Sequence, residues 1–540
     1  MRRRLLTVVM DGVGIRDSIY GNAVKLAPTP NLDRLKQQSL YTQLKAHGTY
    51  VGLPSDSDLG NSEVGHNAFG AGRIFDQGAK LVANAVADKS IFKGDVWQKM
   101  TEQVKANNRS LHLIGLLSDG NVHAHIDHLF ALIKQAKSEG IAKVFVHPLL
   151  DGRDVGPETA EIYMDQLCGF LGEQSSSEFS CQIASGGGRM TTTMDRYEAD
   201  WSMVERGWNA HVHGQAEHRF SSLGEAIKAF RDQDLTDQYF PAFVIEKEGK
   251  PLGPIVSGDA VIFWNFRGDR AIEISRAFTE EDFNAFELGK RPEVSYAGMM
   301  EYDGDLHIPN NYLVNPPKID DTLSEYLLKH NLRQFACSET QKYGHVTFFW
   351  NGNRSGYFDE KKEIYREIKS DPGSFNINPW MKASEITAAT TDAILNDRFD
   401  VGRINYANGD MVGHTGDLEA SIVAMSTVDL QIGRLKEVCD KTGTILIISA
   451  DHGNCDEMFD VKSNDEDWRL VSDKTSWPKA KTSHTTNEVP FYFYDPKGLS
   501  GYELTNKKDC SIASLAATII ECSGLPSHND YLETIVRRRS

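Results

Sequence analysis

The sequence has no apolar stretch approaching the about 18 residues that a membrane-spanning helix requires. The run from Leu5 to Met10 follows three arginines, as in a signal peptide, but Asp11 ends it before the ~7 to 15 residues of such a segment. There is also no pair of cysteines in a C-x-x-C pattern, and the seven cysteines are scattered, which is typical of free thiols in a reducing compartment. We therefore expect a cytoplasmic protein without a membrane partner.

Basic residues are in deficit: 58 lysines and arginines stand against 76 aspartates and glutamates, which gives a net charge of -18. A nucleic-acid partner would need clustered cations on its binding face, so this charge argues against one. A dinucleotide fingerprint is missing as well, because Gly12 and Gly14 are followed by Asp17 where the third glycine belongs. A small anionic substrate is compatible with the sequence if local arginines overcome the unfavourable overall field.

The composition, with 40 % apolar and 25 % charged residues over 540 positions, supplies the cores of several folded domains. Residues 5–10 form a short apolar run that ends at Asp11, and residues 443–450 form a similar run near the other end. Such runs predict buried parallel strands with functional residues at their carboxyl ends. After the first strand, Thr29 is expected to cap a helix that begins at Pro30. This alternation predicts an α/β fold with a doubly wound sheet.

The middle of the chain has a full set of elements of its own. Apolar runs predict strands at residues 111–117, 143–146 and 260–264, and helical spacing predicts a helix at residues 126–137. Stretches rich in glycine, proline and asparagine flank this region, as linkers do. We therefore expect one domain formed by residues 1–76 and 313–540, and a second α/β domain inserted at residues 77–312.

Residues that can bind divalent metals gather in short clusters near both ends of the chain: Asp11, Ser62, Asp410 with His414, Asp451 with His452, and His484. Each cluster alone is weak, because single aspartates and histidines are more often ordinary surface or core residues. Their joint occurrence indicates a site for two metal ions, which can clamp a phosphoryl group. Ser62 opens an expected helix, whose N-terminus favours phosphate, and is the candidate nucleophile. The alternative is that Ser62 or Asn61 only caps that helix.

Arginines in loops of the middle region supply cations for an anion pocket. They lie in segments that also contain glycine or aspartate, and they are Arg153, Arg189, Arg196, Arg267 and Arg270. Guanidinium forks in such loops can bind phosphate and carboxylate in pairs. The alternative for any one of them is a surface salt bridge with a neighbouring aspartate, an explanation that does not extend to all five.

A series of motifs runs along the chain in this order: Asp11-Gly12, Gly60-Asn-Ser62-Glu-Val-Gly-His66, Leu117-Ser-Asp-Gly120, Asp151-Gly-Arg153-Asp154, Asn265-Phe-Arg267-Gly-Asp-Arg270, Glu339-Thr-Gln-Lys342, Asp410-x-x-x-His414, Asp451-His-Gly-Asn454 and Thr482-Ser-His484. Together they resemble the motifs of the 2,3-bisphosphoglycerate-independent phosphoglycerate mutase family. The resemblance spans nearly the whole chain. It implies an alkaline-phosphatase-like, metal-binding fold for the terminal parts and an inserted phosphotransferase domain that binds substrate.

The resemblance also implies the ligands of two divalent metal ions. One ion would be held by Asp410, His414 and His484, and the second by Asp11, Ser62, Asp451 and His452. Manganese is the usual ion that it implies, with magnesium or cobalt as alternatives, and no 2,3-bisphosphoglycerate is needed as a cofactor.

The substrates that the resemblance implies are 3-phosphoglycerate and 2-phosphoglycerate, interconverted in glycolysis and gluconeogenesis. The phosphoryl group would pass to Ser62 and return to the glycerate 2-hydroxyl, with Asp154 as the base for that hydroxyl. The implied substrate-binding residues are His123, Arg153, Asp154, Arg189, Arg196, Arg267 and Arg270, together with Lys342, which would reach the phosphate. The resemblance further implies a monomer. It gives no role to the polar segment 456–481, which we expect either to shield His484 or to be mobile.

Two other functions remain open. The terminal clusters alone also fit a metal-dependent phosphatase or a phosphopentomutase of the same superfamily, and the arginines of the insert distinguish these from a mutase. A catalytically silent binding protein is the alternative from a different class. The complete set of metal-binding residues and the serine argue against it.

Overall fold

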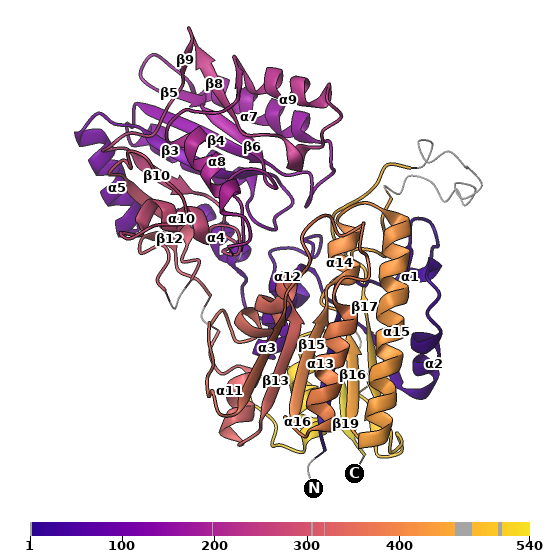
Figure 1. Cartoon of the computed structure of the whole chain (residues 1–540). Helices are drawn as coiled ribbons and strands as arrows, with labels where there is room; N and C mark the ends of the chain where they lie inside the picture. The colour runs from indigo at the N-terminus through magenta and orange to yellow at the C-terminus, as the bar shows by residue number, and fades with distance from the viewer. Residues whose placement is uncertain are drawn as a thin grey trace. The chain divides into compact units, whose positions relative to one another are not determined.

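The computed structural model describes residues 3–196, 198–303, 306–317, 319–459, 478–505 and 510–539. The chain divides into two compact units (Figure 1): Met1–Gln77 with Lys318–Ser540 form unit 1, and Gly78–Pro317 form unit 2. Each unit has a hydrophobic core of its own. The sequence analysis expected the insert to span residues 77–312, and unit 2 spans residues 78–317.

Unit 1 is built around a seven-stranded sheet in the order β14-β13-β15-β1-β16-β17-β2. Its strands are β1 (Leu5–Met10), β2 (Leu40–Leu44), β13 (Gln334–Glu339), β14 (Glu363–Ile368), β15 (Val401–Tyr406), β16 (Ile445–Ser449) and β17 (Val489–Tyr494). The central β1 pairs in parallel with β15 and β16, whereas β17 is antiparallel to both of its neighbours. β1 has the sequence LLTVVM and is buried along its whole length, as expected for a strand covered on both faces.

Helices pack in two groups against this sheet (Figure 1). The group around the long α15 (Leu418–Thr442) also contains α1 (Ala23–Leu26), α2 (Pro30–Gln38), α13 (Ala383–Leu395) and α14 (Asn408–Gly413). The other group contains α3 (Ser62–Ala71), α11 (Leu323–Lys329), α16 (Ser514–Ser523) and the π-helix η4 (His345–Phe349), which follows α12 (Thr340–Gly344). A 3₁₀ turn, η1 (Gly48–Val51), and an antiparallel ribbon of β18 (Tyr502–Leu504) and β19 (Val536–Arg538) complete the unit.

The start of α2 corrects one detail of the sequence analysis. Thr29 precedes Pro30 as expected, but its side chain makes no capping hydrogen bond. The carboxylate of Asp429, on α15, instead accepts hydrogen bonds from the backbone N–H of Asn31 at 3.0 Å and of Leu32 at 2.7 Å. A residue almost 400 positions away therefore satisfies the free N–H groups of this helix.

Unit 2 contains a ten-stranded sheet whose main order is β12-β11-β10-β3-β4-β6-β8-β7, with β5 paired to β4 and β9 to β8. Its strands are β3 (Leu111–Leu117), β4 (Lys143–Leu150), β5 (Ser180–Ile183), β6 (Ser185–Gly188), β7 (His218–Phe220), β8 (Phe243–Lys247), β9 (Lys250–Pro251), β10 (Ala260–Phe263), β11 (Ser295–Met300) and β12 (Tyr312–Val314). The central strands β10, β3 and β4 are parallel. They are apolar and largely buried, as strands between two helical layers are.

The helices of unit 2 are α4 (Gly78–Ala87), α5 (Asp95–Ala106), α6 (Ile126–Ser138), α7 (Ala160–Gln174), α8 (Trp201–His211), α9 (Leu223–Arg231) and α10 (Ile272–Thr279), with short 3₁₀ turns η2 (Ser90–Phe92) and η3 (Asp237–Tyr239). The long strand-to-helix loops after β4, β6 and β10 carry the predicted arginines. In the part of the chain that the structure describes, no helix combines the length and the apolar character needed to span a membrane.

Candidate active site

The metal-suited residues from both chain ends meet at one edge of the unit 1 sheet. Asp11 directly follows β1, Asp451 and His452 follow the neighbouring β16, and Asp410 lies on α14 just after β15. Because β15, β1 and β16 are parallel neighbours, their carboxyl ends lie at the same edge. The sheet therefore brings together residues that are separated by most of the sequence.

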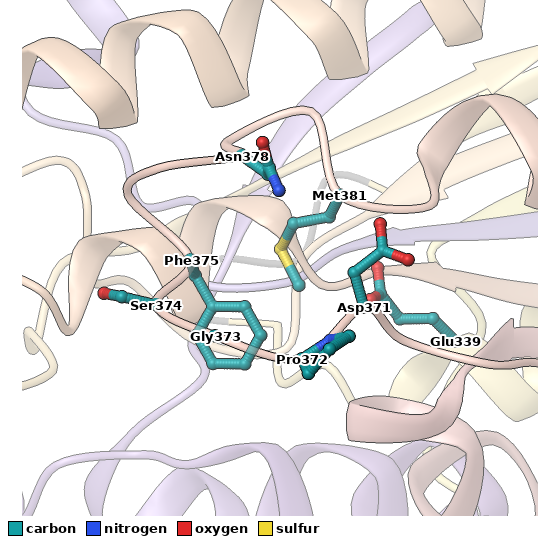
Figure 2. Close-up of a pocket in the computed structure, with 8 residues that line it drawn as sticks. All are labelled: Glu339, Asp371, Pro372, Gly373, Ser374, Phe375, Asn378 and Met381. Atoms are coloured by element: carbon teal, nitrogen blue, oxygen red, sulfur yellow. The ribbon is translucent and has the colours of Figure 1, made fainter.

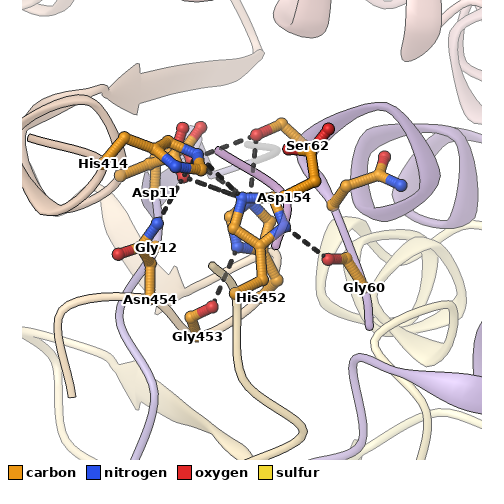
Figure 3. Close-up of polar contacts among 12 residues, drawn as sticks. Asp11, Gly12, Gly60, Ser62, Asp154, His414, His452, Gly453 and Asn454 are labelled. Atoms are coloured by element: carbon orange, nitrogen blue, oxygen red, sulfur yellow. Dashed lines mark hydrogen bonds and ion pairs between the residues drawn. The ribbon is translucent and has the colours of Figure 1, made fainter. Parts of the chain in front are cut away.

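Ser62 is the first residue of α3, and the side chain of Asn61 caps that helix by accepting a first-turn N–H at 3.0 Å. The Ser62 hydroxyl therefore has other partners. Its Oγ lies 2.9 Å from His452 Nε2 and 3.2 Å from Asp11 Oδ1 (Figure 3). The Lys342 ammonium also donates a hydrogen bond to it. The hydroxyl is thus buried among an imidazole, a carboxylate and an ammonium at a helix N-terminus, an environment that suits a nucleophile.

Two groups of buried side chains have ligand atoms within 4.8 Å of one another: Asp11, Asp451 and His452 form the first group, and Asp410, His414 and His484 form the second. In the second group, His414 Nδ1 donates to the Thr482 carbonyl at 2.7 Å, and His484 Nδ1 donates to the Gly60 carbonyl at 2.8 Å. A neutral ring that donates from Nδ1 has a lone pair on Nε2, and the two Nε2 atoms lie 3.0 Å apart. Each is also 3.1 Å from Asp410 Oδ1. Lone pairs that converge in this way fit a shared divalent cation.

The buried carboxylates of these groups carry more negative charge than Lys342 neutralises. Its ammonium donates to Asp11 Oδ1 at 3.0 Å and to Asp410 Oδ2 at 2.7 Å. Burial, together with the charge of Asp451, raises the pKa of Asp11 to about 7. Burial also acts to raise the pKa of Asp410, but Lys342 and His414 hold it well below its usual range. One ammonium among three buried carboxylates leaves a negative site that favours added cations.

The packing of α3 explains why residue 65, in the motif around Ser62, is a glycine. A Cβ atom at this position would lie 2.7 Å from Asp451 Cβ and 2.8 Å from the Asp451 carbonyl oxygen, closer than such atoms approach. Because residue 65 has no side chain, α3 packs directly against the loop of Asp451. This packing brings Ser62 to His452.

Asn405 and Asp456 belong to this site although the sequence analysis did not identify them. The Asn405 amide, near the end of β15, donates to Asp11 Oδ2 at 2.7 Å and so orients that carboxylate. The Asp456 carboxylate accepts the Gly14 N–H at 3.2 Å and the Thr485 hydroxyl at 3.0 Å. It thereby joins two loops that border the metal-suited groups. Neither residue stands in a recognisable motif, and only the contacts between distant segments reveal them.

Glu339, the first residue of the Glu-Thr-Gln-Lys motif, has a role different from that of Lys342. It lines a small pocket together with Asp371, Pro372, Gly373, Ser374, Phe375, Asn378 and Met381 (Figure 2). Its carboxylate accepts the Ser370 hydroxyl at 2.8 Å and the Lys382 N–H at 3.3 Å, and burial raises its pKa to about 7. Glu339 therefore links the loop at residues 370–382 by hydrogen bonds to the end of β13. The helix that carries Lys342 begins at the next residue.

In unit 2, Arg189 and Asp154 form a buried pair. Arg189 donates to Asp151 Oδ1 at 2.6 Å and also binds Asp154. His123 Nε2 lies 3.9 Å from Asp154 Oδ2, and Arg153 is buried in the same loop. Burial, followed by the charge of Arg189, lowers the pKa of His123 well below its usual value, so this imidazole is neutral.

Asp269 organises a second set of arginines in unit 2. Arg267 Nε donates to Asp269 Oδ1 at 3.0 Å, and Arg196 lies 3.7 Å from the other carboxylate oxygen. Arg270 donates to the Met194 carbonyl at 2.7 Å, and burial together with repulsion from Arg196 lowers its pKa. All five predicted arginines are buried, so none is a surface pair. Five guanidinium groups held in three neighbouring loops of unit 2 form a cationic cluster, which suits an anion.

The predicted site residues thus fall into two sets, one in each unit. Asp11, Ser62, Lys342, Asp410, His414, Asp451, His452 and His484 are together in unit 1, whereas His123, Arg153, Asp154, Arg189, Arg196, Arg267 and Arg270 are in unit 2. The prediction that the segment 456–481 shields His484 or is mobile concerns mainly residues 460–477, which lie outside the described residues.

Known proteins resemble this chain over its whole length. Residues 82–304 match a family model described as the BPG-independent PGAM N-terminus. A probable 2,3-bisphosphoglycerate-independent phosphoglycerate mutase of Leptospira interrogans is 50% identical over 542 residues, covering 100% of this chain and 98% of the relative. The corresponding mutase of Trypanosoma brucei brucei is 47% identical, covering 99% and 97%. The chain belongs to the 2,3-bisphosphoglycerate-independent phosphoglycerate mutase family.

A solved structure agrees with this membership. The phosphoglycerate mutase of Leishmania mexicana, determined at low cobalt concentration, superposes with a TM-score of 0.95 at 45% identity, covering 100% of this chain and 98% of that one. The family, the α/β class and the prediction of an enzyme are therefore confirmed.

Proposed function

We propose that this mutase interconverts 3-phosphoglycerate and 2-phosphoglycerate without 2,3-bisphosphoglycerate, through a phosphoryl group carried by Ser62. The observation that carries the proposal is the position of the Ser62 hydroxyl, 2.9 Å from His452 Nε2 and in contact with Asp11 and Lys342. The N–H groups of the first turn of α3 add partial positive charge beside this hydroxyl. Such an environment favours both the attack of the hydroxyl on a phosphoryl group and the binding of the resulting phosphoserine.

We also propose that unit 1 holds two divalent ions, manganese in the first instance, with magnesium or cobalt as alternatives. Asp410, His414 and His484 would hold one ion, and Asp11, Ser62, Asp451 and His452 the other. When bound, such ions ease the deprotonation of a hydroxyl and neutralise charge on phosphoryl oxygens. The converging imidazole lone pairs and the excess of buried carboxylates support this assignment. Carboxylate and imidazole ligands suit these metals, whereas the buried Cys455 thiol is not needed.

In unit 2, we propose that the glycerate and phosphate groups are bound by His123, Arg153, Asp154, Arg189, Arg196, Arg267 and Arg270. Asp154 would take the proton of the 2-hydroxyl, and the Arg189 hydrogen bond fixes the direction of its carboxylate. In unit 1, Lys342 would bind the phosphoryl group as a buried, protonated ammonium, because Asp11 and Asp410 outweigh the effect of burial and raise its pKa. The family resemblance also leads us to propose a monomer of the cytoplasm that works in glycolysis and gluconeogenesis.

The arginines of unit 2 separate a mutase from a phosphatase or a phosphopentomutase. We expect that Arg267→Ala with Arg270→Ala lowers the formation of 2-phosphoglycerate at least about a hundredfold, because two buried charged donors are removed. Slow hydrolysis of 3-phosphoglycerate should persist, because the Ser62 group in unit 1 is unchanged. A coupled assay for 2-phosphoglycerate, run without 2,3-bisphosphoglycerate, and a phosphate-release assay measure the two activities.

The matched control for that double variant is Arg109→Ala with Arg219→Ala. These two arginines are also in unit 2, but both are exposed. The control should keep both activities at the wild-type level. Unchanged interconversion in the Arg267 and Arg270 variant would remove these residues from the proposed substrate site.

A further inference from the structure

A continuous line of polar side chains crosses the apolar interior of unit 2. It begins at an aspartate before β10, passes β3, β4, β6 and the end of α8, and ends at a threonine in the loop after β6. Its members are Asp259, His112, His147, Ser185, His211 and Thr193, and each is at most 2% exposed. A buried polar group without a partner is costly, so a line of six within a hydrophobic core requires a complete set of hydrogen bonds.

Every step of this line is within hydrogen-bonding distance. The five separations are Asp259 Oδ2 to His112 Nε2, 3.2 Å; His112 Nδ1 to His147 Nε2, 3.0 Å; His147 Nδ1 to Ser185 Oγ, 2.6 Å; Ser185 Oγ to His211 Nδ1, 2.7 Å; and His211 Nε2 to Thr193 Oγ1, 2.8 Å. Both ring nitrogens of each histidine are used. The line therefore connects the amino end of β10 to the loop after β6 without a gap.

At the acidic end of the line, the Asp259 carboxylate acts only as a hydrogen-bond acceptor. Besides His112, the Asp259 carboxylate accepts the N–H of Ser110 at 2.9 Å and the N–H of Val256 at 2.9 Å. Burial opposes ionisation, but the His112 hydrogen bond and the two N–H donors hold the pKa of Asp259 below its usual value. The carboxylate is therefore ionised at neutral pH and can only accept.

With neutral rings, one arrangement of protons satisfies all five contacts. His112 must donate from Nε2 to Asp259, so its Nδ1 accepts from His147 Nε2. The bare Nδ1 of His147 then accepts the Ser185 hydroxyl, and Ser185 Oγ in turn accepts from Nδ1 of the next ring, His211. Finally, the bare Nε2 of His211 accepts the hydroxyl of Thr193. Burial lowers the pKa of His211 to about 3 and that of His147 well below its usual value, so both rings are neutral at pH 7.

Thr193 lies at a critical place for the anion-binding residues. Its φ of 67° is a left-handed conformation that β-branched residues rarely adopt, so the backbone here needs external support. Thr193 lies between Arg189 and Arg196 in the sequence. The carbonyl of the next residue, Met194, accepts a hydrogen bond from the Arg270 guanidinium at 2.7 Å. A shift of Thr193 would therefore move the loop that carries Arg196 and the acceptor that orients Arg270.

Gly207 on α8 leaves the space that the Thr193 hydroxyl occupies. A Cβ atom on residue 207 would lie 2.0 Å from Thr193 Oγ1. Glycine in the interior of a helix weakens the helix, so its presence at this point needs a reason. The contact with Thr193 supplies that reason.

We propose that Asp259, His112, His147, Ser185, His211 and Thr193 form a one-directional hydrogen-bond chain that positions the Thr193 turn, and through it Arg196 and Arg270, for binding of the phosphorylated substrate. Thr193 and the five residues behind it are positioning residues, because the chain reaches the substrate only through the arginines. The kinetic consequence rests on the proposed function, whereas the direction of the chain does not.

The proton positions can be measured directly in the wild-type protein. Nitrogen-15 spectra of protein labelled at histidine should show His211 protonated on Nδ1, and His147 and His112 protonated on Nε2, at neutral pH. Single His→Gln variants assign the three signals. The opposite set of tautomers, or an imidazolium at any of the three rings, would overturn the proposed direction. This result does not depend on whether the protein converts 3-phosphoglycerate.

The positioning role is tested by Thr193→Val, which keeps the branched shape but removes the hydroxyl. We expect KM for 3-phosphoglycerate to rise about tenfold, the usual effect of losing one such hydrogen bond, with kcat within about threefold of wild type. Thr193→Ser should restore KM to within about twofold because it keeps the donor. Gly207→Ala should raise KM in the same direction, since its methyl group displaces that hydroxyl.

The matched control is Thr101→Val on α5. Thr101 is also a buried threonine of unit 2, at 1% exposed, but its hydroxyl donates to the Gln98 carbonyl of its own helix. It should leave KM unchanged. If Thr193→Val had the KM of wild type, or if Thr193→Ser failed to restore it, the positioning role would be wrong. If the valine variant does not fold, the positioning role is tested by the histidine tautomers of the wild-type protein and by the KM values of Thr193→Ser and Gly207→Ala. A wild-type protein that does not form 2-phosphoglycerate would instead reject the proposed function.

Discussion

Replacing Ser62 by alanine is expected to lower the formation of 2-phosphoglycerate at least about 10⁴-fold, the scale of effect that follows removal of a catalytic nucleophile. The reason is chemical, because alanine lacks the oxygen that would accept the phosphoryl group. The Ser62 Oγ lies 2.9 Å from His452 Nε2 and contacts Asp11 and Lys342, and alanine removes that one atom. The capping of α3 belongs to Asn61, so the helix itself should remain intact. The coupled assay with 3-phosphoglycerate measures the loss.

Ser421→Ala is the matched control. Ser421 is also buried in unit 1, but its hydroxyl donates to the carbonyl of Asp417, the N-cap residue of α15. This variant should keep the wild-type rate. Substantial activity in Ser62→Ala would exclude the serine as phosphoryl carrier. It would also be the behaviour of a protein whose role is binding, since such a role survives the loss of a single hydroxyl.

Asp410→Asn is expected to lose the metal ion assigned to Asp410, His414 and His484. Asp410 Oδ1 lies 3.1 Å from both imidazole Nε2 atoms, and replacing its carboxylate by an amide removes the charge that a cation needs there. We expect metal affinity to fall at least about a hundredfold. Replacing a residue that only hydrogen-bonds to a metal ligand can already lower the affinity by that factor. Elemental analysis after dialysis against manganese gives the metal content. Chelation of wild type should abolish activity, and manganese should restore it.

The control for the metal experiment is Asp321→Asn. Asp321, His528 and Asp530 also have closely spaced ligand atoms, but they are partly exposed, and the Lys329 ammonium binds Asp321 at 2.5 Å. This variant should keep the metal content of wild type. Two equivalents of metal in Asp410→Asn, or full activity of wild type after complete chelation, would contradict the assigned centre.

Much of the fold can be predicted from the sequence because its signals are local. The nearly continuous apolar run of Leu5–Met10 is β1, and the run at residues 111–117 is β3, with the expected limits. The helix expected at residues 126–137 is α6, Ile126–Ser138. In each case burial of apolar residues decides the structure. The strands are visible in the sequence as short apolar runs, and the helix as apolar residues at helical spacing.

Other features could not be predicted, because they depend on contacts between distant segments. Thr29 stands at the position of a helix cap before Pro30, but the capping hydrogen bonds come from Asp429 on α15. Asn405 is a polar residue in a buried strand, and the pairing of β15 with β1 places its amide beside Asp11. Spacing along the chain gives no information about such contacts.

The candidate site shows the same division. The sequence identifies Asp11 and Asp451 because each follows an apolar strand, and the parallel sheet brings both to one edge. The buried histidine chain of unit 2 has no comparable signal. His112 and His147 lie in apolar strands, where an isolated histidine is ordinarily a core residue, and their connection depends on the register of β3 with β4.

The most direct test of the account is to find the residue that carries the phosphoryl group. Wild-type protein is mixed with 3-phosphoglycerate, without 2,3-bisphosphoglycerate and with manganese present, then quenched rapidly and analysed by peptide mass spectrometry. The account predicts a phosphoryl group on the peptide that contains Ser62, located on that serine, and none there in Ser62→Ala. A phosphoryl group on a histidine instead, or turnover only when 2,3-bisphosphoglycerate is added, would contradict it.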